Sequence, residues 1–327
     1  MKTEMLIEFF AALVITFALT VLLARVIIPI LKSKKMGQKI LDIGPRWHKS
    51  KEGTPTMGGI CFIIPILLVS ALALIVKNDE WKPVLFALGL ALANGLIGLV
   101  DDYAKLIKKQ NEGLLAWQKF GLQVVVAGIY LFLMTRLCGL DTSVSLPFVN
   151  ASFELGAVYY LLAILFIAGM VNSVNLTDGV DGLASSVSLV VSAFFAVVAF
   201  YASVRSLSLL AGVLIGGLVG FLVYNFHPAR VFMGDTGSLF LGGLLTGCAF
   251  IVGNPLIFLI CGLVFVGEAL SVILQVGVFK LSGRKKRLFK MAPIHHHFEQ
   301  CGWSENKVVA VFSAVTLVCC LLAWLAL

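Results

Sequence analysis

The sequence has few charged residues: only 13% of its 327 residues are Asp, Glu, Lys or Arg, whereas 60% are apolar. A water-soluble protein cannot bury so large an apolar fraction in its core. The sequence also lacks the ten-residue segments of alternating polarity that a membrane β-barrel requires, because its long apolar runs are apolar on every side. These absences exclude both classes and predict an all-α polytopic membrane protein.

The seven cysteines form no C-x-x-C pair, and most of them lie inside apolar runs. The sequence therefore predicts neither a disulfide framework nor a thiolate zinc site. An H-E-x-x-H pattern is also missing, which argues against a zinc metalloprotease. The first apolar run is too long for the core of a signal peptide, so we expect it to be a retained membrane span.

Ten apolar runs approach the length of about 20 residues that a helix needs to cross a bilayer. The predicted spans are 6–31, 57–76, 83–100, 121–138, 155–174, 183–201, 207–225, 238–253, 255–279 and 306–327. Ten spans place both termini on one side, where the connector 139–154 shows partial alternation and predicts a small hairpin. We expect one integral membrane domain, residues 1–327.

Basic residues divide unequally between the two sets of connectors. Of the 25 Lys and Arg residues, 19 lie on or directly beside the connectors of the side opposite the termini. Cytoplasmic connectors are enriched in these residues, so we expect both termini to lie outside the cytoplasm. All five histidines and ten of the 17 acids fall on the same inner connectors, which predicts an active site at the cytoplasmic ends of the helices.

Acidic residues mark two of these inner ends. The third span runs into L-V-D-D-Y-A-K, and Asp101 and Asp102 can hold a divalent cation, act as base or nucleophile, or simply form a polar helix end. Asp235 lies in M-G-D-T-G-S, where glycines and a helix N-terminus suit a phosphate. A carboxylate beside phosphate implies Mg²⁺, unless Asp235 only caps its helix. Glu268, inside the ninth span, has a site role or a packing role.

Three further motifs contain polar groups on the inner side. The fifth span ends in N-S-V-N-L-T-D-G-V-D-G, and helix capping explains only one of its four polar groups, which are Asn172, Asn175, Asp178 and Asp181. The triplet in A-P-I-H-H-H-F-E cannot easily converge on one metal, but with nearby cations it suits a pyrophosphate. The segment K-S-K-E-G-T-P-T-M-G-G, with Lys51 and Thr54, gives a weaker indication of phosphate or nucleotide binding.

The motifs TPTMGG, DDYAK, NLTDGVDGLA, NFHPARVFMGDTGSL and APIHHHFE follow one another on the inner connectors. In this order they resemble the phospho-N-acetylmuramoyl-pentapeptide-transferases, a branch of the polyprenyl-phosphate N-acetylhexosamine-1-phosphate transferase superfamily. The resemblance covers nearly the whole chain. It implies Mg²⁺-dependent transfer of phospho-MurNAc-pentapeptide from UDP-MurNAc-pentapeptide to undecaprenyl phosphate. The products would be lipid I and UMP, at the cytoplasmic face of the bacterial inner membrane.

The resemblance also implies roles for single residues. Asp235 resembles the magnesium ligand, and Asp101 or Asp102 resembles the group that deprotonates the lipid phosphate or otherwise aids its attack. The triplet His295, His296 and His297 would act at the pyrophosphate, where Phe232 would stack on the neighbouring uracil. The predicted substrate-binding residues are Lys51, Thr54, Lys119, Asn172, Asn175, Leu176, Asp178, Gly179, Asp181, Asn225, Phe232 and Ser238. Dimers in the lipid bilayer are implied as well, and nucleic acid is not an expected partner.

Three alternatives remain at the level of the sequence. A transferase of the same superfamily could use another UDP-HexNAc for a different glycan. A secondary transporter would also have ten spans with glycine-interrupted helices, but its charged site belongs near the membrane midplane. A purely structural membrane protein would leave the clustering of aspartates unexplained.

Overall fold

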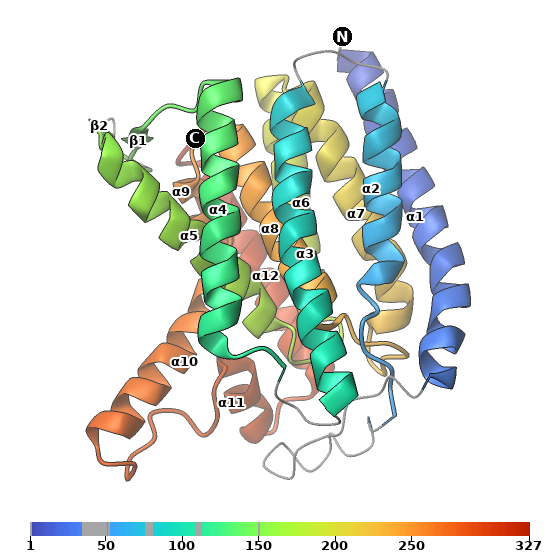
Figure 1. Ribbon diagram of the computed structural model, residues 1–327, viewed down its shortest axis with the longest axis vertical. Helices are drawn as coiled ribbons and strands as arrows, with labels where there is room; N and C mark the ends of the chain where they lie inside the picture. Colours follow the sequence, from blue (N-terminus) through green and yellow to red (C-terminus); the bar gives the residue numbers. More distant parts are fainter. Residues whose placement is uncertain (1, 35–50, 52, 76–80, 109–112, 150) are drawn as a thin grey trace.

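The computed structural model describes residues 2–34, 51, 53–75, 81–108, 113–149 and 151–327, and it is almost entirely helical (Figure 1). In chain order its elements are α1 (Lys2–Ser33), α2 (Ile60–Ile75), α3 (Lys82–Lys108), α4 (Ala116–Cys138), β1 (Ser143–Ser145), β2 (Ser152–Glu154), α5 (Ala157–Thr177), α6 (Leu183–Ala202), α7 (Arg205–Asn225), α8 (Gly234–Val252), α9 (Leu256–Cys261), α10 (Leu263–Leu281), α11 (Ile294–Gln300) and α12 (Glu305–Trp324).

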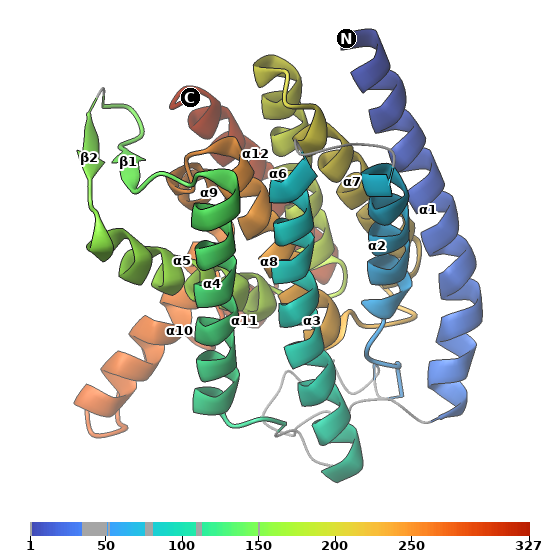
Figure 2. The same ribbon diagram turned by 45° about the horizontal axis from the view of Figure 1, so that its top comes forward.

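Within the described residues, nine of these helices are long and apolar enough to cross a membrane, and α2 is a shorter apolar helix of 16 residues. The prediction of an all-α polytopic membrane protein is confirmed. Both termini lie at the same end of the bundle in both views (Figure 2), as ten passes require. We call the opposite end the site end.

Three features add detail to the ten expected spans: a hairpin, a divided span and a short helix in a connector. The hairpin expected within 139–154 is present, with Val144 paired to Phe153 in an antiparallel register. The expected span 255–279 is divided at Gly262 into the short α9 and the longer α10, which leans away from the bundle (Figure 1). The connector that carries the histidine triplet contains a short helix, α11, where no helix was expected.

Helix α8 is the most deeply buried span, and it packs closely against α3. Small residues allow this approach: a Cβ added to Gly243 would lie 2.9 Å from Cα of Ala91, and one added to Gly98 would overlap the carbonyl of Asp235. Small residues at membrane helix interfaces let backbones come close enough for extensive van der Waals contact. The α3–α8 contact therefore places the end of α3, with its aspartates, directly beside the start of α8.

Candidate functional site

Four segments converge at the site end: the stretch before α2, the end of α3, the loop between α5 and α6, and the loop between α7 and α8. All of them except the end of α3 line a cavity of about 170 Å³, which we call the acidic cavity. Its lining residues are Lys51, Thr56, Asp178, Gly179, Val180, Asp181, Asn225, Phe232, Gly234 and Asp235. Seven of these ten were predicted from the sequence, although they are spread over 185 positions of the chain.

Three aspartates form the most acidic part of this site. Asp101, Asp102 and Asp235 each offer a carboxylate oxygen, and these oxygens lie within 4.8 Å of one another. Asp101 and Asp102 are almost completely buried. The helical contact described above explains how residues more than 130 positions apart meet here.

Asp102 caps helix α8 from the neighbouring helix α3. Its carboxylate accepts hydrogen bonds from the amide of Asp235 (3.2 Å) and from both the amide (2.9 Å) and the hydroxyl (2.7 Å) of Thr236. No side chain at the N-cap position of α8 makes such a bond. The capping role considered for Asp235 therefore belongs to Asp102, and the carboxylate of Asp235 is directed to other groups.

Two lysines and an amide hold the Asp235 carboxylate in place. Lys105 Nζ lies 2.9 Å from Asp235 Oδ2 and 2.6 Å from Asp101 Oδ2, and Lys119 Nζ lies 2.9 Å from Asp235 Oδ2. Asn175 donates from Nδ2 to Asp235 Oδ1 at 2.9 Å. Sequence reasoning did not include Lys105 among the site residues, although its i,i+4 spacing from Asp101 was the signal for this ion pair.

The donor set fits a hard divalent cation. Three carboxylates face only two ammonium groups, so negative charge is in excess, and carboxylate oxygens are the ligands that Mg²⁺ prefers. Asp178 also lines the acidic cavity, together with Asp235. Burial and the carboxylates of Asp235, Asp102 and Asp181 raise its pKa well above the usual range, while the amide of Gly234 acts in the opposite direction. A bound cation would relieve this repulsion.

On the other wall of the acidic cavity, Lys51 forms an ion pair with Asp181, with Nζ 2.7 Å from Oδ1. Asn225 is fixed by Ser185, which donates to its Oδ1, and by its own donation to the carbonyl of Val231. Phe232 lies at the same wall. An aromatic ring, a cation and a fixed amide are the groups that recognise a nucleotide base.

The histidine triplet lies behind this cavity on α11. His295 is fully buried, and its Nδ1 donates to Glu268 Oε2 at 3.0 Å, since a carboxylate can only accept. Glu268, on α10, is thus paired with a residue of another helix, α11. His296 Nδ1 lies 2.6 Å from Glu299 Oε2, and His297 Nδ1 accepts from the amide of Lys290. None of the three is among the residues that line the acidic cavity, and His295 meets its wall through Gly179.

The other predicted residues lie at varied distances from the acidic cavity. Asn172 donates to Gln123 Oε1 on α4 and to the carbonyl of Ala168, so it faces a helix interface. Ser238 accepts from Asn175 and donates to the carbonyl of Gly234, which supports the start of α8. Thr54 lines a neighbouring cavity of about 680 Å³. Leu176 is half-buried and lines neither cavity.

A substitution at Gly179 tests how tightly His295 packs against the wall of the acidic cavity. A Cβ at position 179 would overlap the imidazole Nε2, and His295 is fully buried and held by Glu268. We expect Gly179→Ala to lower the free energy of unfolding by about 1–3 kcal/mol, the usual cost of overpacking. Thermal unfolding in detergent measures this change. The control is Gly169→Ala on α5, where the added Cβ meets nothing within 4 Å; equal melting temperatures for both variants would contradict the expectation.

Comparison with known proteins agrees with this geometry. Residues 84–253 match the model of glycosyl transferase family 4, and residues 51–63 match the first signature of phospho-N-acetylmuramoyl-pentapeptide-transferase. The chain is 45% identical over 316 residues to the phospho-N-acetylmuramoyl-pentapeptide-transferase of Clostridium novyi (strain NT), with 97% of this chain and 96% of the relative covered. The protein of the same name from Clostridium kluyveri (strain NBRC 12016) is 44% identical, with 97% and 98% covered. The chain therefore belongs to the phospho-N-acetylmuramoyl-pentapeptide-transferase family.

Proposed function

We propose that the protein transfers phospho-MurNAc-pentapeptide from UDP-MurNAc-pentapeptide to undecaprenyl phosphate, forming lipid I and UMP for peptidoglycan synthesis. The observation that carries the proposal is the group of Asp101, Asp102 and Asp235 beside a cavity at the site end of an apolar helix bundle. A soluble nucleotide can enter this end from the cytoplasm, and a lipid phosphate reaches the same level from the membrane. A secondary transporter would need its charged site near the midplane instead.

The reaction exchanges one phosphate bond for another. An oxygen of the lipid phosphate forms a bond to the sugar-linked phosphorus of the UDP substrate, and the bond from that phosphorus to the bridging oxygen breaks. The electron pair of the broken bond leaves with UMP. A phosphate monoester is already a nucleophile near neutral pH, so the protein mainly has to position two anions and neutralise their charge.

The described residues suit these tasks. Lys105 and Lys119, both directed at Asp235, supply positive charge beside the place where the diphosphate would lie. Phe232, Asn225 and Lys51 form the wall suited to the uracil. Asp101, near the site end of α3, is placed to orient or deprotonate the lipid phosphate.

Magnesium fits the same arrangement. Asp235 would be its main ligand, and Asp101 or Asp102 would contribute a further oxygen, because their carboxylates lie within reach of one ion. When bound, the ion would neutralise charge on the diphosphate and so stabilise the leaving UMP. The excess of carboxylates over ammonium groups supports this proposal.

Release of UMP by the purified protein tests the proposal directly. With undecaprenyl phosphate, UDP-MurNAc-pentapeptide and Mg²⁺ together, we expect UMP and a lipid-linked product in equal amounts, and chelation by EDTA should stop both. UDP-GlcNAc in place of the first nucleotide separates this activity from that of another polyprenyl-phosphate transferase. Lipid product from UDP-GlcNAc alone would refute the proposed substrate, and turnover that persists in EDTA would refute the proposed metal.

A further inference from the structure

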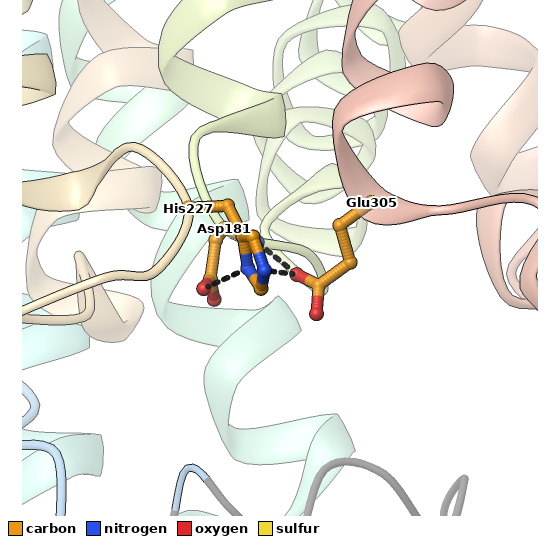
Figure 3. A group of neighbouring side chains, drawn as sticks. All are labelled: Asp181, His227 and Glu305. Carbon is orange, nitrogen blue, oxygen red and sulfur yellow. Dashed lines mark hydrogen bonds and ion pairs between the residues drawn. The ribbon is translucent and has the colours of Figure 1, made fainter.

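Lys51, Asp181, His227 and Glu305 form a cluster of charged or titratable side chains at the neighbouring cavity, and Figure 3 shows the last three of them. Lys51 precedes α2, Asp181 lies in the loop between α5 and α6, His227 follows α7, and Glu305 is the first residue of α12. Lys51 Nζ lies 2.7 Å from Asp181 Oδ1 and 2.6 Å from Glu305 Oε2. Sequence reasoning missed Glu305, because an acid directly after Ser304 reads as an ordinary first-turn residue of a helix.

The carboxylate oxygens of Asp181 and Glu305 accept most of their hydrogen bonds from other groups of the protein. Asp181 Oδ2 accepts from the amide of Ala229 and lies 3.0 Å from His227 Nδ1, while Oδ1 faces Lys51. Glu305 Oε2 accepts from Lys51 and also from the amide of Asp181 at 3.2 Å. Asp181 and Glu305 are both buried. Their carboxylates therefore serve to hold other protein groups.

Lys51 is the group that these carboxylates orient. An ammonium group has three N–H donors, and two of them are directed to Asp181 and Glu305. Lys51 also lines both the acidic cavity and the neighbouring cavity of about 680 Å³. With two donors fixed, the direction of the third is set by the tetrahedral geometry of the nitrogen, and it is the one that an acceptor in the cavity can use.

The cluster does not call for a metal ion. Asp181, His227 and Glu305 do offer ligand atoms within 4.8 Å of one another. However, the ammonium of Lys51 lies between the two carboxylates and already supplies the positive charge, so a cation would have to displace it. The neighbouring group of Asp101, Asp102 and Asp235 differs in its donors, because all three residues are carboxylates, the ligands that Mg²⁺ prefers.

A second buried carboxylate on one lysine points to a role beyond stability. Burying ion pairs costs desolvation that their attraction often only balances, so such groups are weak contributors to folding. We propose that Glu305 is a positioning residue, which together with Asp181 holds Lys51 in the orientation that recognises the nucleotide. The inference rests on the proposed function, and it extends the site to α12, close to the C-terminus.

The affinity of Glu305 variants for the nucleotide tests this positioning role independently of the turnover rate. Glu305→Gln keeps the size of the side chain but removes the charge that fixes Lys51. We expect the Kd for UMP, measured by calorimetry, and the KM for UDP-MurNAc-pentapeptide to rise about tenfold, while kcat changes less than about twofold, as for a loss of binding equal in ground and transition states. Glu305→Asp, which restores the charge at a slightly greater distance, should recover most of the affinity.

A double-mutant cycle distinguishes positioning from a general structural role. If Glu305 acts through Lys51, Glu305→Gln should change the Kd for UMP little in a Lys51→Met background. The control is Glu8→Gln, which removes the partner of Arg205 at the opposite end of the bundle and should leave UMP binding unchanged. An equal loss of affinity with and without Lys51, or no loss in either Glu305 variant, would overturn the inference.

The same measurements separate this inference from the proposed function. Wild-type protein that releases UMP from the proposed substrates, but whose affinity for UMP does not depend on Glu305, overturns the inference alone. If Glu305→Gln weakens UMP binding relative to the wild type, but the wild type shows no turnover, the proposed function alone is overturned. Absence of both UMP binding and turnover overturns both.

Discussion

Replacing Asp235 by asparagine is expected to reduce UMP release about 100-fold or more, a loss typical of removing a group that stabilises charge in the transition state. The Asp235 carboxylate lies between Lys105, Lys119 and Asn175 and within 4.8 Å of ligand atoms on two other aspartates. A neutral amide would lose the charge that attracts Mg²⁺, and its NH₂ group would face ammonium donors. Steady-state UMP release over a range of magnesium concentrations measures the effect.

The protein should remain folded, because Asp102 rather than Asp235 caps helix α8. Thermal unfolding in detergent checks this point for the same preparation. Asp141→Asn is a matched control, since Asp141 is an acid on the connector near the termini, far from the site. Near-normal turnover of Asp235→Asn with unchanged magnesium dependence would show that Asp235 is neither ligand nor catalytic group.

Labelled UMP should not be incorporated into UDP-MurNAc-pentapeptide by delipidated wild-type protein, with exchange at least about 100-fold slower than complete turnover. Such exchange requires a covalent aspartyl intermediate. Both candidate nucleophiles are already engaged: Asp102 accepts three hydrogen bonds from the start of α8. Asp101 accepts from Leu114 and Lys105. Carboxylates that are fixed in this way orient their neighbours, and the lipid phosphate supplies the nucleophile.

Radiolabelled UMP and separation of the nucleotides measure the exchange, with added undecaprenyl phosphate as the positive control. The aspartate variants provide a second readout. Asp101→Asn should keep slow turnover that rises with pH, as the lipid phosphate ionises without help from a base. Asp102→Asn should in addition lower the free energy of unfolding by about 1–3 kcal/mol, because an NH₂ group would face the amides of α8. Rapid lipid-independent exchange in the wild type would establish the aspartyl intermediate instead.

Much of the site follows from local sequence features. Asp178, Asp181 and Asp235 could be found because acids beside glycines, at the ends of apolar runs, are seldom needed for helix packing, and all three line the acidic cavity. Lys51 was a weaker prediction, and it lies at the same cavity. Asn172 shows the limit of this reasoning, since a polar group inside an apolar run needs a partner, but its partner is Gln123 on another helix.

The sequence by itself determined the class of the protein, the common side of the termini and the motifs that identify its family. These properties depend on the length of apolar runs and on residue order, which are local. Only the tertiary structure decided which side chains meet: Asp102 caps α8, His295 is buried against Glu268 behind Gly179, and Glu305 contacts Lys51. Such contacts depend on how closely helices pack and how each is rotated about its axis. Small residues such as Gly98 and Gly243, for example, let α3 and α8 come close together.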